Sequence, residues 1–166
     1  MYAGDLTPKQ AWEYLLSNPS VELVDVRTDG EWLQDGVPDL SALNRPVHFL
    51  SWNAKALEKP SYFIQALQEL SFTSTTPLLF LCRSGGRSKS AAFLASNNGF
   101  SKAYNIQGGF LGHLSSFAHE ASTPGWKQQG LPWGLPVSYT HLDVYKRQIL
   151  NGSLHKISAP FFHPTI

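Results

Sequence analysis

One short segment constrains the fold more than any other part of this chain. Residues 77–81 are apolar and typical of a buried strand, and a helical pattern begins near Ser88 and continues to about Asn98. Between them lies a polar loop that starts with Cys82, the single cysteine of the chain. A strand that leads through a tight loop into a helix is the repeating unit of parallel α/β sheets, and sites in such sheets form beyond the carboxyl ends of the strands. We therefore expect Cys82 to lie at such a site.

Further segments of the chain alternate between strand-like and helix-like patterns. This alternation predicts a three-layer α/β fold, in which a mostly parallel central sheet is flanked by helices. Two of the helices open with a capping box, which Thr7 forms with Gln10 and Thr28 forms with Glu31. The predicted strands are residues 21–26, 47–50, 78–81 and 103–106, and a further helix is predicted at residues 61–70.

Composition excludes several classes of protein. The chain has 166 residues, of which 42% are hydrophobic and 15% charged, and this predicts one globular domain rather than a disordered chain. A net charge of +1 without a basic run argues against nucleic-acid binding, and a single cysteine excludes an internal disulfide. Because the chain lacks a signal-peptide pattern and an apolar run of membrane-spanning length, we expect a cytoplasmic location and no membrane association.

The loop after Cys82 is suited to a reactive thiolate. Two glycines allow a tight turn whose N–H groups point inward, and the helix that follows places partial positive charge near the sulfur. Arg83 and Arg87 add positive charge on both sides of the glycines. A buried structural cysteine is the simpler alternative, but it would need neither a Gly-Gly turn nor flanking arginines.

Four segments, in order along the chain, resemble the rhodanese family of sulfurtransferases. The resemblance covers residues 5–135 and implies a rhodanese-like fold. In residues 34–40 the chain departs from the family, because Gln-Asp-Gly-Val-Pro-Asp-Leu stands where the family has a Gly-His-Ile-Pro-Gly-Ala-like motif, and this predicts a non-standard substrate entrance. The four segments are the strand end Asp25-Val26-Arg27, the loop from Cys82, the turn at Gly108-Gly109, and Trp126 followed by Gly130-Leu131-Pro132.

Loop length separates two chemistries among proteins that resemble this family. Sulfur-transferring members have four residues between the cysteine and the arginine, as between Cys82 and Arg87 here, whereas phosphatase-like members have a longer loop. The resemblance implies that Cys82 takes a sulfane sulfur from thiosulfate or a similar small donor as a persulfide. Cyanide, a thiol or a protein would then accept the sulfur, and no metal or cofactor is implied. A carrier or binding module without turnover is the main alternative, and a phosphatase or arsenate reductase is a third.

The resemblance also assigns a role to each candidate site residue. Cys82 is the expected nucleophile, and the loop that follows it is expected to bind the donor. Asp25 and Arg27 are expected to support the loop from a neighbouring strand end. Two simpler roles stay open, namely that Arg87 pairs with a carboxylate and that the loop serines cap the helix. The expected donor-binding residues are Arg83, Ser84, Gly85, Gly86, Arg87 and Ser88.

Residues 137–148 resemble a translated sequencing adapter rather than a protein motif. They can be encoded by DNA that is its own reverse complement, as two adapter ends joined head to head would be. We therefore expect the rhodanese-like domain to comprise residues 1–135, and residues 136–166 to be an artefactual or chimeric tail.

Overall fold

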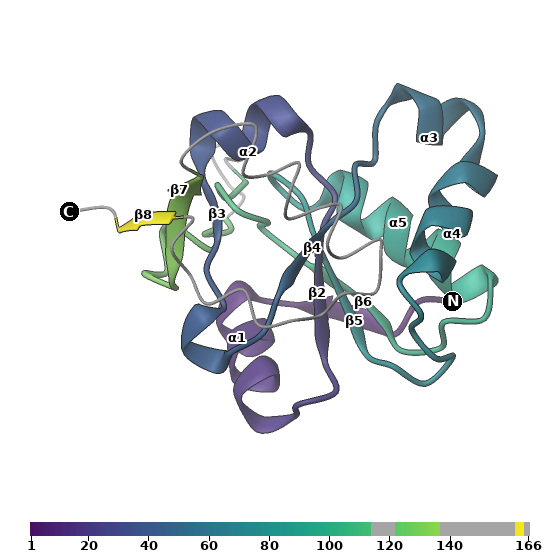
Figure 1. Ribbon diagram of the computed structural model, residues 1–166, viewed down its shortest axis with the longest axis horizontal. Coiled ribbons are helices and arrows are strands. Elements are labelled where there is room, and N and C mark those ends of the chain that lie inside the picture. Colours follow the sequence, from purple (N-terminus) through teal and green to yellow (C-terminus); the bar gives the residue numbers. More distant parts are fainter. Residues whose placement is uncertain (114–121, 137–161, 165–166) are drawn as a thin grey trace.

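Five short strands form a parallel sheet at the centre of the molecule (Figure 1). The computed structural model describes residues 1–113 and 122–136, together with the backbone of residues 162–164. The central strand of the sheet has a parallel neighbour on each side, and Cys82 follows this strand directly. The order across the sheet is β1 (Gly4–Leu6), β6 (Ala103–Ile106), β5 (Leu78–Leu81), β2 (Glu22–Asp25) and β4 (Val47–Phe49).

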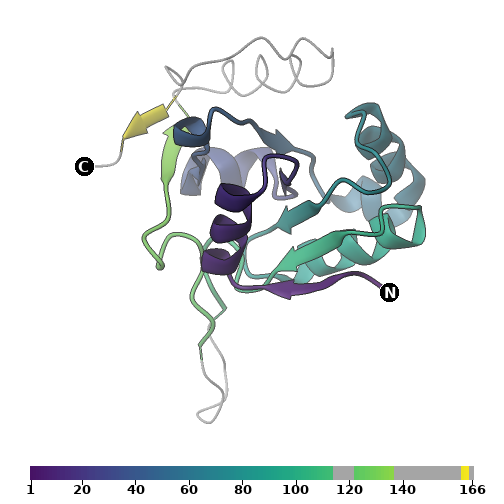
Figure 2. The same cartoon turned by 90° about the horizontal axis from the view of Figure 1, so that it is seen from below.

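Alternation of side chains along the strands decides which helices cover each face of the sheet. Leu23 and Leu79 belong to a core shared with α1 and α2, whereas their neighbours Val24 and Phe80 belong to a core shared with α3, α4 and α5. The two groups of helices lie on opposite sides of the sheet (Figures 1 and 2). The predicted three-layer α/β architecture is therefore confirmed. The helices are α1 (Pro8–Ser17), α2 (Asp29–Asp35), α3 (Ala54–Glu58), α4 (Pro60–Glu69) and α5 (Gly86–Asn97).

Local sequence signals place most of these elements correctly. Both predicted capping boxes are present, so that Thr7 opens α1 and Thr28 opens α2. The predicted strands agree with β2, β4, β5 and β6 to within two residues at each end. The helix after the cysteine loop begins two residues earlier than predicted, because Gly85 takes a left-handed conformation with a φ of 110° and serves as the N-cap of α5.

Several short elements were not predicted from the sequence. They are the edge strand β1, the helix α3, a 3₁₀ turn at Ser41–Leu43, and a small second sheet. That sheet has the order β3 (Val37–Pro38), β7 (Trp133–Pro136) and β8 (Phe162–Pro164), with antiparallel pairs. β7 continues one residue past the expected domain end at 135, and most of the expected tail, residues 137–161 and 165–166, lies outside the described residues.

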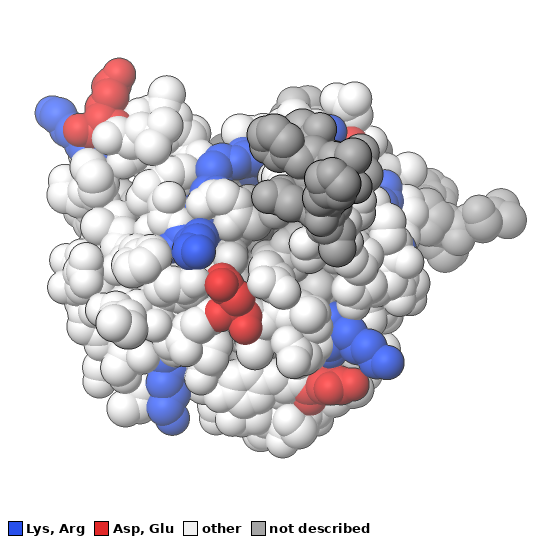
Figure 3. Space-filling view, turned by 180° about the vertical axis from the view of Figure 1, so that it is seen from behind, with Lys and Arg blue, Asp and Glu red and all other residues white. Residues whose placement is uncertain are grey.

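Two further features of the molecule are the charges on its surface and the length of its helices. On the face drawn in Figure 3, small groups of basic and acidic side chains are separated by neutral surface. Within the part of the chain that the structure describes, no helix is both long and apolar enough to cross a membrane.

Candidate active site

The sulfur of Cys82 lies beneath the loop that joins β5 to α5. The side chain is only 1% exposed, while Arg83 and Ser84, which follow it, are exposed. Two groups approach the sulfur, since the Gly85 N–H donates to Sγ at 3.1 Å and the Ser88 hydroxyl lies 3.1 Å from it. A backbone N–H donor at this distance stabilises negative charge on a sulfur.

The glycine turn after β6 holds the loop from the other side. The Phe110 N–H donates to the Cys82 carbonyl oxygen at 2.8 Å, and the Leu111 N–H donates to the Arg83 carbonyl oxygen at 2.9 Å. Gly109 has a φ of 58°, and a Cβ atom there would overlap the backbone carbonyls of both loop residues. The absence of a side chain at Gly109 therefore lets two backbone segments meet, which gives this glycine a structural role in the site.

Asp25 and Arg27 form a fully buried ion pair at the carboxyl end of β2. Arg27 Nη2 lies 2.7 Å from one Asp25 oxygen, and Nε donates to both oxygens of the carboxylate. Nη2 also donates to the Gly36 carbonyl oxygen at 2.8 Å. The guanidinium lies 4.1 Å from the centroid of the Phe110 ring, so the pair supports the residue that holds Cys82. That Asp25 and Arg27 support the cysteine loop during a reaction stays a prediction.

Arg87 is engaged by Glu31 of α2. Two hydrogen bonds of 2.7 and 2.8 Å join the guanidinium to the two carboxylate oxygens, in the bidentate geometry that Arg favours. Burial alone would raise the pKa of Glu31, but the hydrogen bonds and charge of Arg87, with further bonds from Thr28, lower that pKa on balance. The hydrogen bonds to Glu31 in turn raise the pKa of Arg87.

This ion pair confirms that Arg87 pairs with a carboxylate, while its expected role in donor binding stays a prediction. Its guanidinium pairs with a carboxylate, whereas the exposed Arg83 forms no ion pair with another described residue. Glu31 was not predicted as a site residue. Its one sequence signal, the capping box with Thr28, indicated only the start of a helix.

The two loop serines do not cap α5, so that interpretation of the sequence is wrong. Gly85 is the N-cap and no side chain accepts a capping hydrogen bond there. Ser88 instead lies inside the first turn of α5, fully buried, with its hydroxyl between Cys82 and Asn105. Asn105 was not predicted as a site residue, because nothing in the sequence of β6 indicates which face its side chain takes.

The segment that departs from the rhodanese pattern is held by the closing segment of the domain. Val37 and Leu40 are buried, and β3 pairs with β7. Lys127 donates to the Asp35 carbonyl oxygen at 2.6 Å, and its ammonium lies 3.7 Å from the centroid of the Trp133 ring. Burial lowers the pKa of Lys127.

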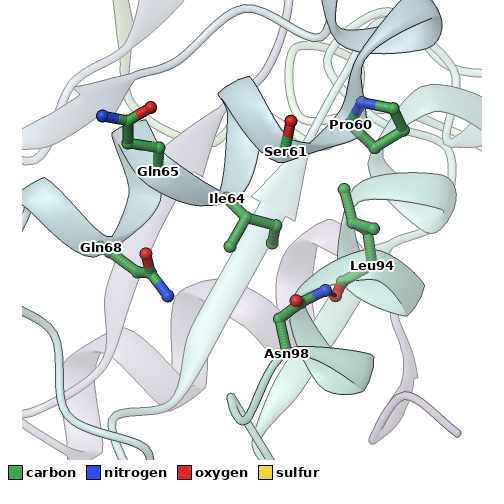
Figure 4. A pocket seen from close by; sticks show the side chains of 7 residues that line it. All are labelled: Pro60, Ser61, Ile64, Gln65, Gln68, Leu94 and Asn98. Carbon is green, nitrogen blue, oxygen red and sulfur yellow. Dashed lines mark hydrogen bonds between the residues drawn. The ribbon is translucent and has the colours of Figure 1, made fainter.

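A groove of about 460 Å³ lies between α4 and α5, away from the Cys82 loop (Figure 4). It contains amide and hydroxyl groups but no acid, base or cysteine, so it offers no group for covalent or acid–base chemistry. Among the described residues no cluster of His, Cys, Asp and Glu could hold a metal ion. The loop at Cys82 is therefore the candidate active site. The groove is lined by Pro60, Ser61, Ile64, Gln65, Gln68, Leu94 and Asn98.

Known families and proteins match the part of the chain that contains the candidate site. The sequence model of the family described as STR4 middle domain matches residues 3–139. An uncharacterized protein of Rickettsia conorii is 36% identical over 133 residues, which cover 80% of this chain and 98% of that protein. The crystal structure of Rv0390 from M. tuberculosis has 44% sequence identity and a TM-score of 0.67, over 80% of this chain and 98% of that chain.

More distant relatives carry names that refer to sulfur chemistry. Rhodanese-like domain-containing protein 4, a chloroplastic protein of Arabidopsis thaliana, is 26% identical over 85% of this chain and 28% of its own length. The thiosulfate sulfurtransferase GlpE of Actinobacillus pleuropneumoniae is 27% identical over 77% of this chain and 90% of its own length.

Proposed function

The chain belongs to the STR4 middle domain family and has a rhodanese-like fold, and on that premise we propose that it is a sulfurtransferase with Cys82 as its nucleophile. The observation that carries the proposal is the position of the Cys82 sulfur. It lies at the carboxyl end of the central strand, with the Gly85 N–H directed to it and the Ser88 oxygen 3.1 Å away. This arrangement suits a sulfur atom that carries negative charge during part of a reaction cycle.

The first displacement would load the enzyme. A lone pair of the Cys82 thiolate attacks the outer, sulfane sulfur of a donor such as thiosulfate. A new S–S bond forms to Sγ, the bond inside the donor breaks, and its electron pair leaves with sulfite. The negative charge then lies mainly on the outer sulfur of the persulfide, and no metal, cofactor or external oxidant is needed.

The second displacement would discharge the enzyme. An acceptor such as cyanide or a thiolate attacks the outer sulfur, and the electron pair of the broken S–S bond returns to Sγ. Because Cys82 is the single cysteine of the chain, the acceptor must be another molecule, either a small nucleophile or a protein. Separate loading and discharge predict ping-pong kinetics.

Arg83 and Arg87 have different roles in this proposal. Arg83 is exposed and forms no ion pair with another described residue, so its charge is available to attract an anionic donor. Arg87, paired with Glu31, holds α2 against the loop and adds to the positive potential near the sulfur. The other loop residues, Ser84, Gly85 and Gly86, would contribute backbone donors and space.

The proposal is tested by intact-protein mass spectrometry of the full chain before and after incubation with thiosulfate. We expect the parent to gain one sulfur atom, to lose it on addition of cyanide, and to form thiocyanate over many turnovers. Cys82→Ser, verified as folded by circular dichroism, is the control and is expected to gain nothing. A sulfur gain without turnover would instead favour the carrier module. The phosphatase function would be favoured instead if the folded parent gains no sulfur and hydrolyses an aryl phosphate. Loss of that hydrolysis in Cys82→Ser would complete the case.

A further inference from the structure

Three side chains behind Cys82 form a continuous path of hydrogen bonds to the edge of the sheet. The Ser88 oxygen lies 3.1 Å from Cys82 Sγ and 2.6 Å from Asn105 Oδ1. Asn105 Nδ2 donates to Asp5 Oδ1 at 2.8 Å, and the Tyr2 hydroxyl donates to the same oxygen at 2.9 Å. Ser88 and Asn105 are buried whereas Asp5 is exposed, so the path runs from the sulfur to the surface.

Asp5 decides which way the Asn105 amide faces. A carboxylate only accepts hydrogen bonds, so the NH₂ group of Asn105 must face Asp5 and the amide oxygen must face Ser88. Partial burial and the hydrogen bond to Asp5 raise the pKa of Tyr2, which keeps its hydroxyl protonated as a second donor to that carboxylate. The orientation of the Asn105 amide is therefore set by its hydrogen bond to Asp5.

The orientation of Asn105 in turn controls the single hydrogen of Ser88. One hydroxyl hydrogen serves one strong bond, and the amide oxygen of Asn105, at 2.6 Å, is a stronger acceptor than an uncharged sulfur at 3.1 Å. With its hydrogen on Asn105, Ser88 presents a lone pair to Cys82. This suits a Cys82 thiol, which can donate to Ser88, and it suits the uncharged Sγ of a persulfide. The thiolate of Cys82 without bound sulfur needs the Ser88 hydrogen for itself. Taking that hydrogen leaves the buried Asn105 oxygen without a donor.

We propose that Asp5 and Asn105 are positioning residues that favour the sulfur-loaded form of Cys82 over its empty thiolate. This inference rests on the proposed sulfurtransfer, because loading moves the negative charge from Sγ to the outer sulfur and lets Ser88 keep its bond to Asn105. The network therefore promotes loading and resists loss of sulfur to a weak acceptor, which suits a protein that must hold sulfur until a specific acceptor arrives.

Several other charges surround the sulfur and must be held constant in a test. Arg83 lies on the loop and Arg87 on α5, and Glu31 of α2 contacts Arg87. The buried pair of Asp25 and Arg27 lies at the end of the neighbouring strand β2. None of these groups contacts Asp5 in the described part of the chain, so a change at Asp5 leaves their hydrogen bonds in place.

Asp5→Asn tests the inference because the new amide can both donate and accept, which frees Asn105 to turn over. The Ser88 hydrogen is then available to the thiolate. The pH dependence of Cys82 alkylation by iodoacetamide reports the balance between its thiol and its thiolate. In Asp5→Asn we expect this balance to move about fivefold toward the thiolate, which is the ratio for one hydrogen bond of about 1 kcal/mol. The ratio of loaded to empty protein at a set ratio of thiosulfate to sulfite is expected to fall by a similar factor.

Two controls separate this effect from the loss of a negative charge. Glu13→Gln removes an exposed carboxylate on α1 and should leave both measurements unchanged. Asp5→Asn combined with Ser88→Ala should show no shift relative to Ser88→Ala alone, because the hydrogen that moves is gone. An unchanged alkylation profile in Asp5→Asn, or an equal shift without Ser88, would overturn the inference. Failure of thiosulfate to load the parent would count against the proposed function, while the alkylation profiles would still decide the role of Asp5.

Discussion

Gly109→Ala is the substitution whose effect can be worked out most directly from the structure. Gly109 follows β6, where its backbone passes across the start of the cysteine loop. A Cβ atom at this position would overlap the Cys82 carbonyl oxygen and would lie 2.6 Å from the Arg83 carbonyl carbon and 2.7 Å from its oxygen. All three are backbone atoms between a central strand and a helix, so they cannot move aside as a flexible side chain would.

Two costs add up at this position. Alanine in the left-handed region at a φ of 58° costs about 1–2 kcal/mol, and overpacking against fixed atoms costs about 1–3 kcal/mol more. Gly99→Ala is the matched control, because Gly99 has a φ of 98° but a Cβ atom there would meet nothing within 4 Å. We expect Gly99→Ala to destabilise by the backbone cost of about 1–2 kcal/mol alone, and Gly109→Ala by about 2–5 kcal/mol.

Urea unfolding of both variants and the parent measures the difference, and thiosulfate loading measures its effect on the site. Since the overlap falls on the residues that carry the sulfur, Gly109→Ala should also reduce the rate of loading, whereas Gly99→Ala should leave it unchanged. Equal destabilisation by the two variants, with equal loading, would show that the close approach of the turn to the loop does not constrain the site.

Three further predictions concern charged residues. Arg83→Gln should raise the KM for thiosulfate roughly three- to tenfold, measured by steady-state kinetics, and change the free energy of unfolding by less than about 0.5 kcal/mol; an unchanged KM would remove Arg83 from donor binding. Glu31→Gln should lower the free energy of unfolding by about 1 kcal/mol at neutral pH. Because the ion pair with Arg87 lowers the pKa of Glu31, the difference between variant and parent in urea unfolding should shrink as the pH falls below about 4.5. A difference that does not change with pH would contradict the ion pair. Arg27→Met should lower the free energy of unfolding by about 3–5 kcal/mol, since it leaves the buried Asp25 carboxylate unpaired. Adding Asp25→Leu should restore part of this stability. No recovery in the double variant would mean that Arg27 contributes packing rather than charge.

The sequence was sufficient for elements that depend on nearby residues. The capping box of Thr7 with Gln10 closes within one helical turn, and the apolar run at β5 is long enough to mark a buried strand. β1 escaped prediction because it has three residues, lies at the edge of the sheet and is defined by its pairing with β6, about a hundred residues away. Short edge strands carry little periodic signal, so only the partner strand reveals them.

The candidate site divides along the same line. Cys82, its glycines and the spacing to Arg87 could be recognised in sequence, because the loop that contains them is continuous. Glu31 and Asn105 could not, since each reaches the loop from a different element, and neither residue type has a sequence environment that indicates an interior contact.

By itself, then, the sequence determined the longer strands and helices, the place of Cys82 at a strand end and the resemblance of its loop to the rhodanese family. These features depend on backbone propensity, capping and spacing within short stretches of chain. Only the tertiary structure decided that Arg87 is paired while Arg83 pairs with no other residue that the structure describes, that Ser88 faces the sulfur instead of capping α5, and that Asn105 lies between Ser88 and Asp5. Those contacts join residues that meet only when the parallel sheet is assembled, because strand order and side-chain direction arise from packing the whole domain at once.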